Sequence, residues 1–529
     1  MRNLIKLLAI AAVVIAFCAG EEIGFSDLSL EENVSLVSEK SSKNLSKTHA
    51  HYIRGILYDH EDNVEQAIKE YLAASALDST VPAIHKRLAV DYIKSGKYEQ
   101  AEEEFLIVKG LTPEDLSVRR ILAHFYTAQE QFEKATAAYQ DLLKDAPDDL
   151  EILASLADLY VIQDKLEEAI EIYQEILQAK PDSEQAHFNL GIMYTKSNTL
   201  DLAEEHFQKA LEIAPDYLQA ELALALLNEI NQNFPEAIKH YQKALGIDPL
   251  NINVYRRLAQ TYYLNNRVDD ALRQYEFILK LNPYDIDAYL ELAYIHLDLK
   301  QYKKCLEILQ EAQKHKDSWR ITVEAKFVSA AKVKELRQIR EEQVNLILGL
   351  AFTQLGENQK AIESYQKAIA AQPESGTGYF YLGAMYEQTS QRQKAFEALE
   401  KSVELDSSNA DALNYLGFIY AEEGINLAAA EELIKQALEI DPNNGAYIDS
   451  LGWVYFKKGM IDQALAEVKR ATSILEDAEI WEHLGDIYHA QGEFQKAQDA
   501  WEKAQGLEPE RSSIKEKLEK LENQRKASR

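Results

Sequence analysis

Residues 150–183 read LEILASLADLYVIQDKLEEAIEIYQEILQAKPDS, and this stretch decides the fold of the chain. In each half the apolar residues follow the i, i+3, i+4, i+7 spacing of one buried helical face. Small residues stand at Ala157 and Ala169, and Tyr173 follows the second one after a helical turn. Pro181 closes the stretch, and proline ends a helix because it lacks an N–H donor and its ring clashes with the preceding turn. The stretch therefore predicts two helices joined by a short turn.

The same pattern recurs along the chain. Nine of the eleven prolines stand twelve residues after an alanine. These prolines are Pro113, Pro147, Pro181, Pro215, Pro249, Pro283, Pro373, Pro442 and Pro509. The alanines are Ala101, Ala135, Ala169, Ala203, Ala237, Ala271, Ala361, Ala430 and Ala497. Through the first six members of each set the spacing is 34 residues without interruption, which is typical of a repeat architecture.

A second small residue precedes these alanines, in nearly every copy by twelve positions. It is glycine or alanine, as at Gly191 and Ala259, and a ring follows it three residues later, as at Tyr194 and Tyr262. Two helices that pack at about 8–10 Å require small side chains where their backbones come closest. Small residues in both halves therefore predict two helices that cross closely, with the rings filling the space between neighbouring pairs.

This pattern resembles the tetratricopeptide repeat (TPR), a 34-residue helix–turn–helix with small residues at both crossing positions and a closing proline. We count thirteen copies, which together span 442 of the 529 residues. They start at Thr48, Pro82, Leu116, Leu150, Glu184, Leu218, Ile252, Ile286, Glu342, Gly376, Ala410, Gly445 and Ala478. The resemblance implies an all-α fold, a right-handed α-solenoid superhelix of about thirteen units in which each unit contacts only its neighbours.

The copies also set the organisation of the chain. Copies one to eight occupy residues 48–319, and copies nine to thirteen occupy residues 342–511. The remaining 87 residues form three pieces, at 1–47, 320–341 and 512–529. None of these pieces is long enough for a separate catalytic domain. The last piece has apolar residues at helical spacing, and we expect a C-terminal helix that caps the final repeat.

Motifs for catalysis, cofactor binding and metal binding are missing. The chain has no HExxH, no phosphate-binding loop and no GxSxG, each of which carries a specific chemistry. We therefore expect no catalytic residue, no cofactor and no metal, although an enzyme with an unrecognised scattered site stays open as an alternative. The net charge of −31 disfavours nucleic acid as a partner, because phosphate binding requires a basic surface.

The N-terminal residues have the features of a secretory signal peptide. Residues 1–17 read MRNLIKLLAIAAVVIAF, with Arg2 and Lys6 ahead of an apolar run that is too short to span a bilayer comfortably. The end of this run resembles a bacterial lipoprotein box, which implies that Cys18 is the lipidated first residue of the mature protein. The alternatives are ordinary cleavage near Cys18 and a retained membrane anchor. Residues 18–47 have few large apolar side chains and are predicted to form a flexible tether.

The largest break in the repeat pattern is the insert at residues 320–341, RITVEAKFVSAAKVKELRQIRE. It has six basic and three acidic residues, against the trend of the chain, and a loose apolar stripe at helical spacing. Two interpretations stay open. The insert is either a basic helical element that binds a partner or acts as a hinge, or an extra helix that packs into the stack.

The first helix of each TPR lines the concave groove of the array, and several aromatic residues fall there in the C-terminal copies. We predict a partner-binding surface for proteins or peptides from these residues, with packing between repeats as the alternative. The candidate residues are Phe380, Tyr381, Asn414, Tyr415, Phe418, Trp453 and Phe456.

Residues 413–459, LNYLGFIYAEEGINLAAAEELIKQALEIDPNNGAYIDSLGWVYFKKG, resemble the C-terminal repeats of bacterial envelope TPR lipoproteins. That group includes the adaptor of a periplasmic carboxyl-terminal-processing protease. The resemblance implies a non-enzymatic, protein-binding scaffold of the cell envelope, a lipoprotein of the outer membrane that faces the periplasm and brings an enzyme and its substrates together. The alternatives are a scaffold of an assembly or export machine, for polysaccharide secretion or pilus biogenesis, and a secreted or soluble periplasmic protein.

Overall fold

The computed structural model describes residues 39–321 and 329–527. These residues form 27 α-helices and no β-strand, with one isolated bridge between Asp285 and Arg320. The predicted all-α fold is therefore confirmed. In this described part of the chain no helix is long and apolar enough to cross a membrane. The predicted signal peptide and Cys18 lie outside the described residues.

The chain divides into two compact units, Met1–Leu250 and Asn251–Arg529, which we call the N-terminal unit and the C-terminal unit. The N-terminal unit has α2 (Glu39–His60), α3 (Val64–Leu77), α4 (Pro82–Lys94), α5 (Tyr98–Leu111), α6 (Leu116–Ala128), α7 (Phe132–Asp145), α8 (Leu150–Ile162), α9 (Leu166–Ala179), α10 (Glu184–Lys196), α11 (Leu200–Ile213), α12 (Leu218–Ile230) and α13 (Phe234–Ile247). The C-terminal unit has α14 (Ile252–Leu264), α15 (Val268–Leu281), α16 (Ile286–Asp298), α17 (Tyr302–Lys314), α18 (Ala330–Gln354), α19 (Asn358–Ala371), α20 (Gly376–Gln388), α21 (Arg392–Leu405), α22 (Ala410–Glu422), α23 (Leu427–Ile440), α24 (Gly445–Lys457), α25 (Ile461–Ile474), α26 (Ala478–Ala490), α27 (Phe494–Leu507) and α28 (Ser512–Ala527).

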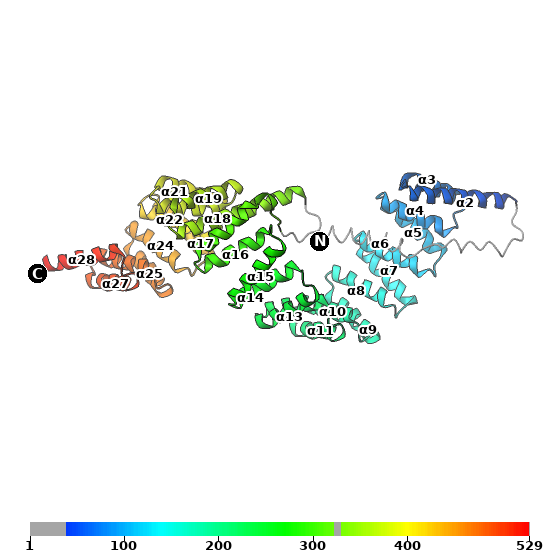
Figure 1. Ribbon diagram of the computed structural model, residues 1–529, viewed down its shortest axis with the longest axis horizontal. Helices are drawn as coiled ribbons and strands as arrows, with labels where there is room; N and C mark the ends of the chain where they lie inside the picture. The colour runs from blue at the N-terminus through cyan, green and yellow to red at the C-terminus, as the bar shows by residue number, and fades with distance from the viewer. Residues whose placement is uncertain (1–38, 322–328, 528–529) are drawn as a thin grey trace. The chain divides into compact units, whose positions relative to one another are not determined.

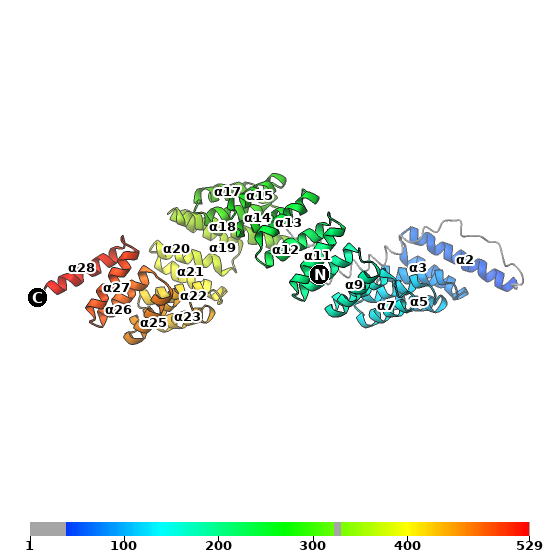
Figure 2. The same ribbon diagram turned by 90° about the horizontal axis from the view of Figure 1, so that it is seen from below.

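Consecutive helices pair into hairpins, α2 with α3 through α12 with α13 in the N-terminal unit and α14 with α15 through α26 with α27 in the C-terminal unit. These thirteen hairpins correspond to the thirteen predicted copies. Within a unit, the second helix of each hairpin also packs against the first helix of the next. Figures 1 and 2 show the hairpins of each unit side by side in chain order.

The crossing point of each hairpin is a small residue against a large side chain. Gly191 lies so close to Phe207 that a Cβ on the glycine would stand 2.5 Å from the ring, and a Cβ on Gly349 would stand 2.3 Å from Tyr365. The anchor alanine of the second helix, such as Ala203, is fully buried. Close backbone approach therefore brings the two helices of a hairpin together, as the spacing predicted.

Six first helices begin at a side-chain cap two residues after the closing proline. Asp149, which follows Pro147, accepts hydrogen bonds from the N–H groups of Glu151 at 3.0 Å and Ile152 at 3.2 Å. Such a cap stabilises a helix by about 1 kcal/mol. Asp115, Ser183, Asn251, Asp285 and Asn444 cap their helices in the same way.

The turn inside each hairpin contains at least one residue in the left-handed region. Five turns have a glycine there, for example with φ of +73° at Gly96 and +78° at Gly492. Eight other turns have a residue with a side chain at this point, namely Asp62, Glu130, Asp164, Asn198, Gln232, Asn266, Lys300 and Ser390. A side chain costs about 1–2 kcal/mol in this conformation, so the packing of the two helices fixes these turns more than the turn residue does.

The C-terminal part of the insert is not a separate helix. Residues 330–341 form the start of α18, which continues without a break into the ninth repeat. Ser329 caps it by accepting a hydrogen bond from the Lys332 N–H at 3.2 Å. Ahead of the insert, Trp319 is buried, and its Nε1 donates to the Ala312 carbonyl at 2.7 Å. The Arg337 guanidinium donates to the Trp319 carbonyl at 3.2 Å and so ties α18 to this segment.

The two ends of the array are helical. Helix α2 begins at Glu39, so residues 39–47 of the segment predicted as a flexible tether are helical instead. These residues extend the first helix of the first repeat. At the other end, α28 packs on α27 and buries Ile514 and Leu521.

Candidate protein-binding surface

The first helices of the C-terminal unit pack on one another as well as on their own second helices. Helix α16 contacts α18, α18 contacts α20, α22 contacts α24, and α24 contacts α26. We call the surface that these helices present away from the second helices the first-helix face. The sequence-predicted partner-binding residues all belong to these helices, Phe380 and Tyr381 to α20, Asn414, Tyr415 and Phe418 to α22, and Trp453 and Phe456 to α24.

Three of the predicted residues form an aromatic patch, which consists of Phe380, Tyr381 and Tyr415. The Phe380 ring centroid lies 5.3 Å from that of Tyr381 and 6.0 Å from that of Tyr415, the latter in an edge-to-face arrangement. All three side chains are half-buried. The Tyr415 hydroxyl donates to the Glu387 carboxylate at 3.4 Å, and burial, together with that carboxylate, raises the pKa of Tyr415 to about 12. The patch thus joins two successive repeats and keeps part of each ring exposed.

The other two predicted residues of α22 are also half-buried. The Asn414 side-chain oxygen is buried and accepts no hydrogen bond from the described residues. The Phe418 ring centroid lies 6.3 Å from that of His483 in α26. Phe418 therefore belongs to the packing between repeats as much as to the surface.

Trp453 is a packing residue, which is the alternative that the sequence left open. It is only 7% exposed, and its ring stacks on His483 with centroids 3.9 Å apart and on Phe456 at 4.9 Å. Its indole N–H donates to the Glu422 carboxylate of α22. The side chain thus holds α22, α24 and α26 together. Phe456, beside it, is half-buried.

A buried ion pair lies under this cluster. His483 Nδ1 is 2.8 Å from an Asp449 carboxylate oxygen, and both residues are buried. Burial lowers the pKa of His483. The Asp449 carboxylate raises this pKa, with smaller contributions from Glu479 and Asp486, and these effects together outweigh burial, so the net change of the pKa is upward. The pair therefore favours a charged histidine in the core of the last repeats.

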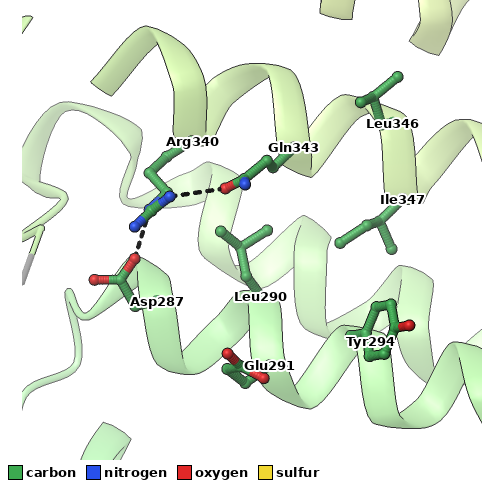
Figure 3. Close-up of a pocket in the computed structure, with 8 residues that line it drawn as sticks. All are labelled: Asp287, Leu290, Glu291, Tyr294, Arg340, Gln343, Leu346 and Ile347. Atoms are coloured by element: carbon green, nitrogen blue, oxygen red, sulfur yellow. Dashed lines mark hydrogen bonds and ion pairs between the residues drawn. The ribbon is translucent and has the colours of Figure 1, made fainter. Parts of the chain in front are cut away.

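The first-helix face also has a pocket between α16 and α18, with a volume of about 420 Å³ (Figure 3). Arg340, from the end of the insert, donates through Nε to an Asp287 carboxylate oxygen at 2.5 Å and through Nη1 to the Gln343 side-chain oxygen at 3.0 Å. The eight lining residues are Asp287, Leu290, Glu291, Tyr294, Arg340, Gln343, Leu346 and Ile347. The pocket is thus apolar along its walls and carries an internal ion pair at one end.

The pocket and the aromatic patch lie near each other on the first-helix face. Tyr294 of the pocket is 56% exposed. Burial raises the pKa of Tyr381, and the nearby Asp411 and Tyr294 raise it further. The surface between the two features therefore has a mixture of aromatic and acidic side chains.

Sequence reasoning did not identify the pocket. Asp287, Leu290 and Tyr294 stand at positions 2, 5 and 9 of the repeat that starts at Ile286, so the spacing that selected the aromatic residues could have found them. Arg340 could not be found in this way, because it belongs to the insert, which has no place in the repeat register.

Comparisons with known proteins agree with this architecture. Family models described as tetratricopeptide repeat or TPR repeat match residues 122–184, 184–217, 230–266 and 266–320. Residues 318–525 match the model of the cilia and flagella-associated protein 70 C-terminal domain. No curated protein sequence matches the chain significantly.

Several solved structures are similar to the chain. The crystal structure of an APC/C hetero-tetramer is similar over 91% of this chain and 98% of its own, with 16% identity and a TM-score of 0.41. A tetratricopeptide repeat protein from Parabacteroides merdae is similar over 51% of this chain and 98% of its own, with 18% identity and a TM-score of 0.34. A TPR protein from Thermus thermophilus is similar over 34% of this chain and 98% of its own, with 20% identity and a TM-score of 0.31.

Stacked helical hairpins with small residues at each crossing define an all-α repeat protein. The repeat length, the closing prolines and the family matches identify the repeats, and the chain is a tetratricopeptide-repeat protein. Repeats of this family imply a protein-interaction scaffold.

The Asp449–His483 pair predicts a pH-dependent stability of the last repeats. Because the folded pKa of His483 lies above its ordinary value of 6.5, the pair's stabilisation is complete below about pH 6.5 and is lost as the pH rises through the folded pKa. We therefore expect a lower free energy of unfolding at about pH 9 than at about pH 6. Urea denaturation followed by tryptophan fluorescence measures it, because Trp453, Trp481 and Trp501 lie in these repeats.

Two variants control this measurement. His483→Gln removes the titrating group and should flatten the pH dependence. His49→Gln, at an exposed site in the N-terminal unit, should leave it unchanged. Equal pH dependence in the wild type and in His483→Gln would contradict the role of the pair.

Proposed function

We propose that the first-helix face of the C-terminal unit binds an extended segment of a partner protein. The observation that carries this proposal is the aromatic patch of Phe380, Tyr381 and Tyr415, which lies on successive first helices and keeps its rings partly exposed. Half-exposed aromatic side chains on a rigid surface provide contact area at little entropic cost, and such residues are enriched among binding hot spots. The neighbouring pocket adds a recess in the same face.

We also propose that the chain acts as an adaptor in the bacterial cell envelope, anchored through a lipid on Cys18. This proposal is supported by the leader-like residues 1–17 and by the resemblance of residues 413–459 to envelope TPR lipoproteins. A scaffold that holds an enzyme and its substrate together raises their effective concentration without chemistry of its own. Recovery of a processing protease with cell-wall hydrolases would support the adaptor, whereas recovery of polysaccharide-secretion or pilus components would support the assembly-scaffold alternative.

If the aromatic patch binds the partner, the double substitution Phe380→Leu with Tyr415→Leu should weaken peptide binding. Leucine keeps much of the apolar volume in the stack but removes the rings, so we expect about a tenfold or greater loss of affinity for peptides selected on the wild-type chain. The measurement is selection of a random peptide library on the immobilised full chain, followed by titration of the selected peptides against each variant.

Phe494→Leu is the matched control, because Phe494 is 45% exposed on a second helix, away from the first-helix face. It should keep the wild-type affinity, and circular dichroism should show the same helix content in all variants. Unchanged peptide affinity in the double variant would refute binding at the aromatic patch.

The lipid anchor predicts incorporation of a labelled fatty acid when the chain is expressed in a bacterium that processes lipoproteins. We expect the wild type to carry the label and to sediment with membranes, and Cys18→Ser to lose both, because a thioether-linked lipid requires the cysteine sulfur. An unlabelled wild-type protein that stays in the soluble fraction would reject the anchor. Cys305→Ser, at a fully buried position, should retain the label.

A further inference from the structure

The pocket between α16 and α18 has separate apolar and charged parts. Figure 3 shows the Arg340–Asp287 pair at one end, Leu290 in the middle, and Leu346, Ile347 and Tyr294 at the other end, with Glu291 below Leu290 on α16. The volume of about 420 Å³ lies in the range of about 300–1,000 Å³ that is typical of ligand pockets. The recess is therefore large enough for one long side chain.

The one cation among the lining residues of the pocket already has partners. Arg340 is bound by Asp287 and Gln343. Arg256, from the neighbouring α14, donates to both carboxylate oxygens of Asp285 at 3.0 and 3.2 Å.

Glu291 is a further acidic residue of the pocket, and it belongs to neither the Arg340–Asp287 pair nor the Arg256–Asp285 pair. Its side chain is half-buried, and its carboxylate makes no hydrogen bond or ion pair with the residues that the structure describes. Burial raises the pKa of Glu291, Arg256 and Arg340 lower it from a distance, and Asp287 raises it. A half-buried carboxylate without a partner is costly, and a cation that binds beside it lowers that cost.

Tyr294 adds a second contact for a cation. It follows Glu291 by three residues on the same helix and is 56% exposed, so its ring is open to a ligand. Lysine and arginine bind to the faces of aromatic rings while their aliphatic stems cover apolar surface. The net charge of −31 favours approach of a cationic segment over an anionic one.

We infer that the pocket between α16 and α18 accepts a lysine or arginine side chain of the bound segment. The aliphatic stem lies against Leu290 and Ile347, and the charged group lies at Glu291 and the Tyr294 ring. This inference rests on the proposed function, since the basic residue belongs to the same segment that binds the aromatic patch. It names the chemistry of the partner, an extended segment with a basic residue beside apolar ones.

The test uses the full chain and a random library of peptides of about twelve residues. Peptides selected on the wild type should share a lysine or arginine at one position, and this preference should vanish on Glu291→Gln. The matched control is Glu276→Gln, which makes the same change of charge at an exposed site on the second helix α15 and should keep the preference. Neutralising Glu291 removes a half-buried charge, so the variant is expected to fold.

A double-mutant cycle then isolates the contact. One selected peptide is synthesised with lysine at the preferred position and again with norleucine, which keeps the stem and removes the charge. On the wild type the norleucine peptide should bind about tenfold more weakly, and on Glu291→Gln the two peptides should bind within about twofold of each other.

Three outcomes would overturn the inference. Peptides that bind and depend on Phe380 and Tyr415 but show no basic preference would refute the pocket assignment and leave the proposed function standing. A basic preference that persists on Glu291→Gln would refute the role of Glu291. Failure of the library to yield any binding peptide would refute both the proposed function and the inference.

Discussion

The structure depends on one contact, the approach of a glycine or alanine in each first helix to a side chain sixteen residues later in the second helix, or seventeen residues later at Gly417. Gly191 against Phe207 and Gly349 against Tyr365 leave no room for a larger crossing residue. Because the contact sits inside each hairpin and recurs with the repeat, every hairpin presents the same faces to its neighbours. Several first helices of the C-terminal unit consequently contact one another directly, α16 with α18, α18 with α20, α22 with α24 and α24 with α26. Rigid helices can position side chains for binding but have few loops to carry a catalytic site.

The candidate binding features of this scaffold lie where the insert interrupts the repeat pattern and where successive first helices carry aromatic side chains. The insert lengthens α18 and brings Arg340 to the Asp287 carboxylate, so one irregular segment creates the charged end of the pocket. The next two first helices carry the rings of the aromatic patch. The two features lie on one face of one unit, and the partner that we propose for them is an extended segment with basic and apolar residues.

The repeat and its hairpins could be predicted because each follows from a local rule with a fixed spacing. The pattern of small residues and closing prolines predicted thirteen hairpins, and the structure has them. The burial of Trp453 could not be decided from its repeat position, since it depends on His483 from the next repeat. The continuity of the insert with α18 and the unpaired state of Glu291 likewise depend on contacts between repeats, which no spacing within one repeat encodes.

The most direct test of the crossing contact is the stability of Gly485→Ala, measured by hydrogen exchange of the amides in α26 and α27. A Cβ at Gly485 would lie 2.3 Å from Trp501, whereas a Cβ at Gly506, on α27, meets nothing within 4 Å. None of the crossing alanines in the described repeats faces a tryptophan. The account predicts that Gly485→Ala lowers the local free energy of unfolding by about 1–3 kcal/mol and that Gly506→Ala raises it by about 0.5–1 kcal/mol. Wild-type or higher stability of Gly485→Ala would contradict it.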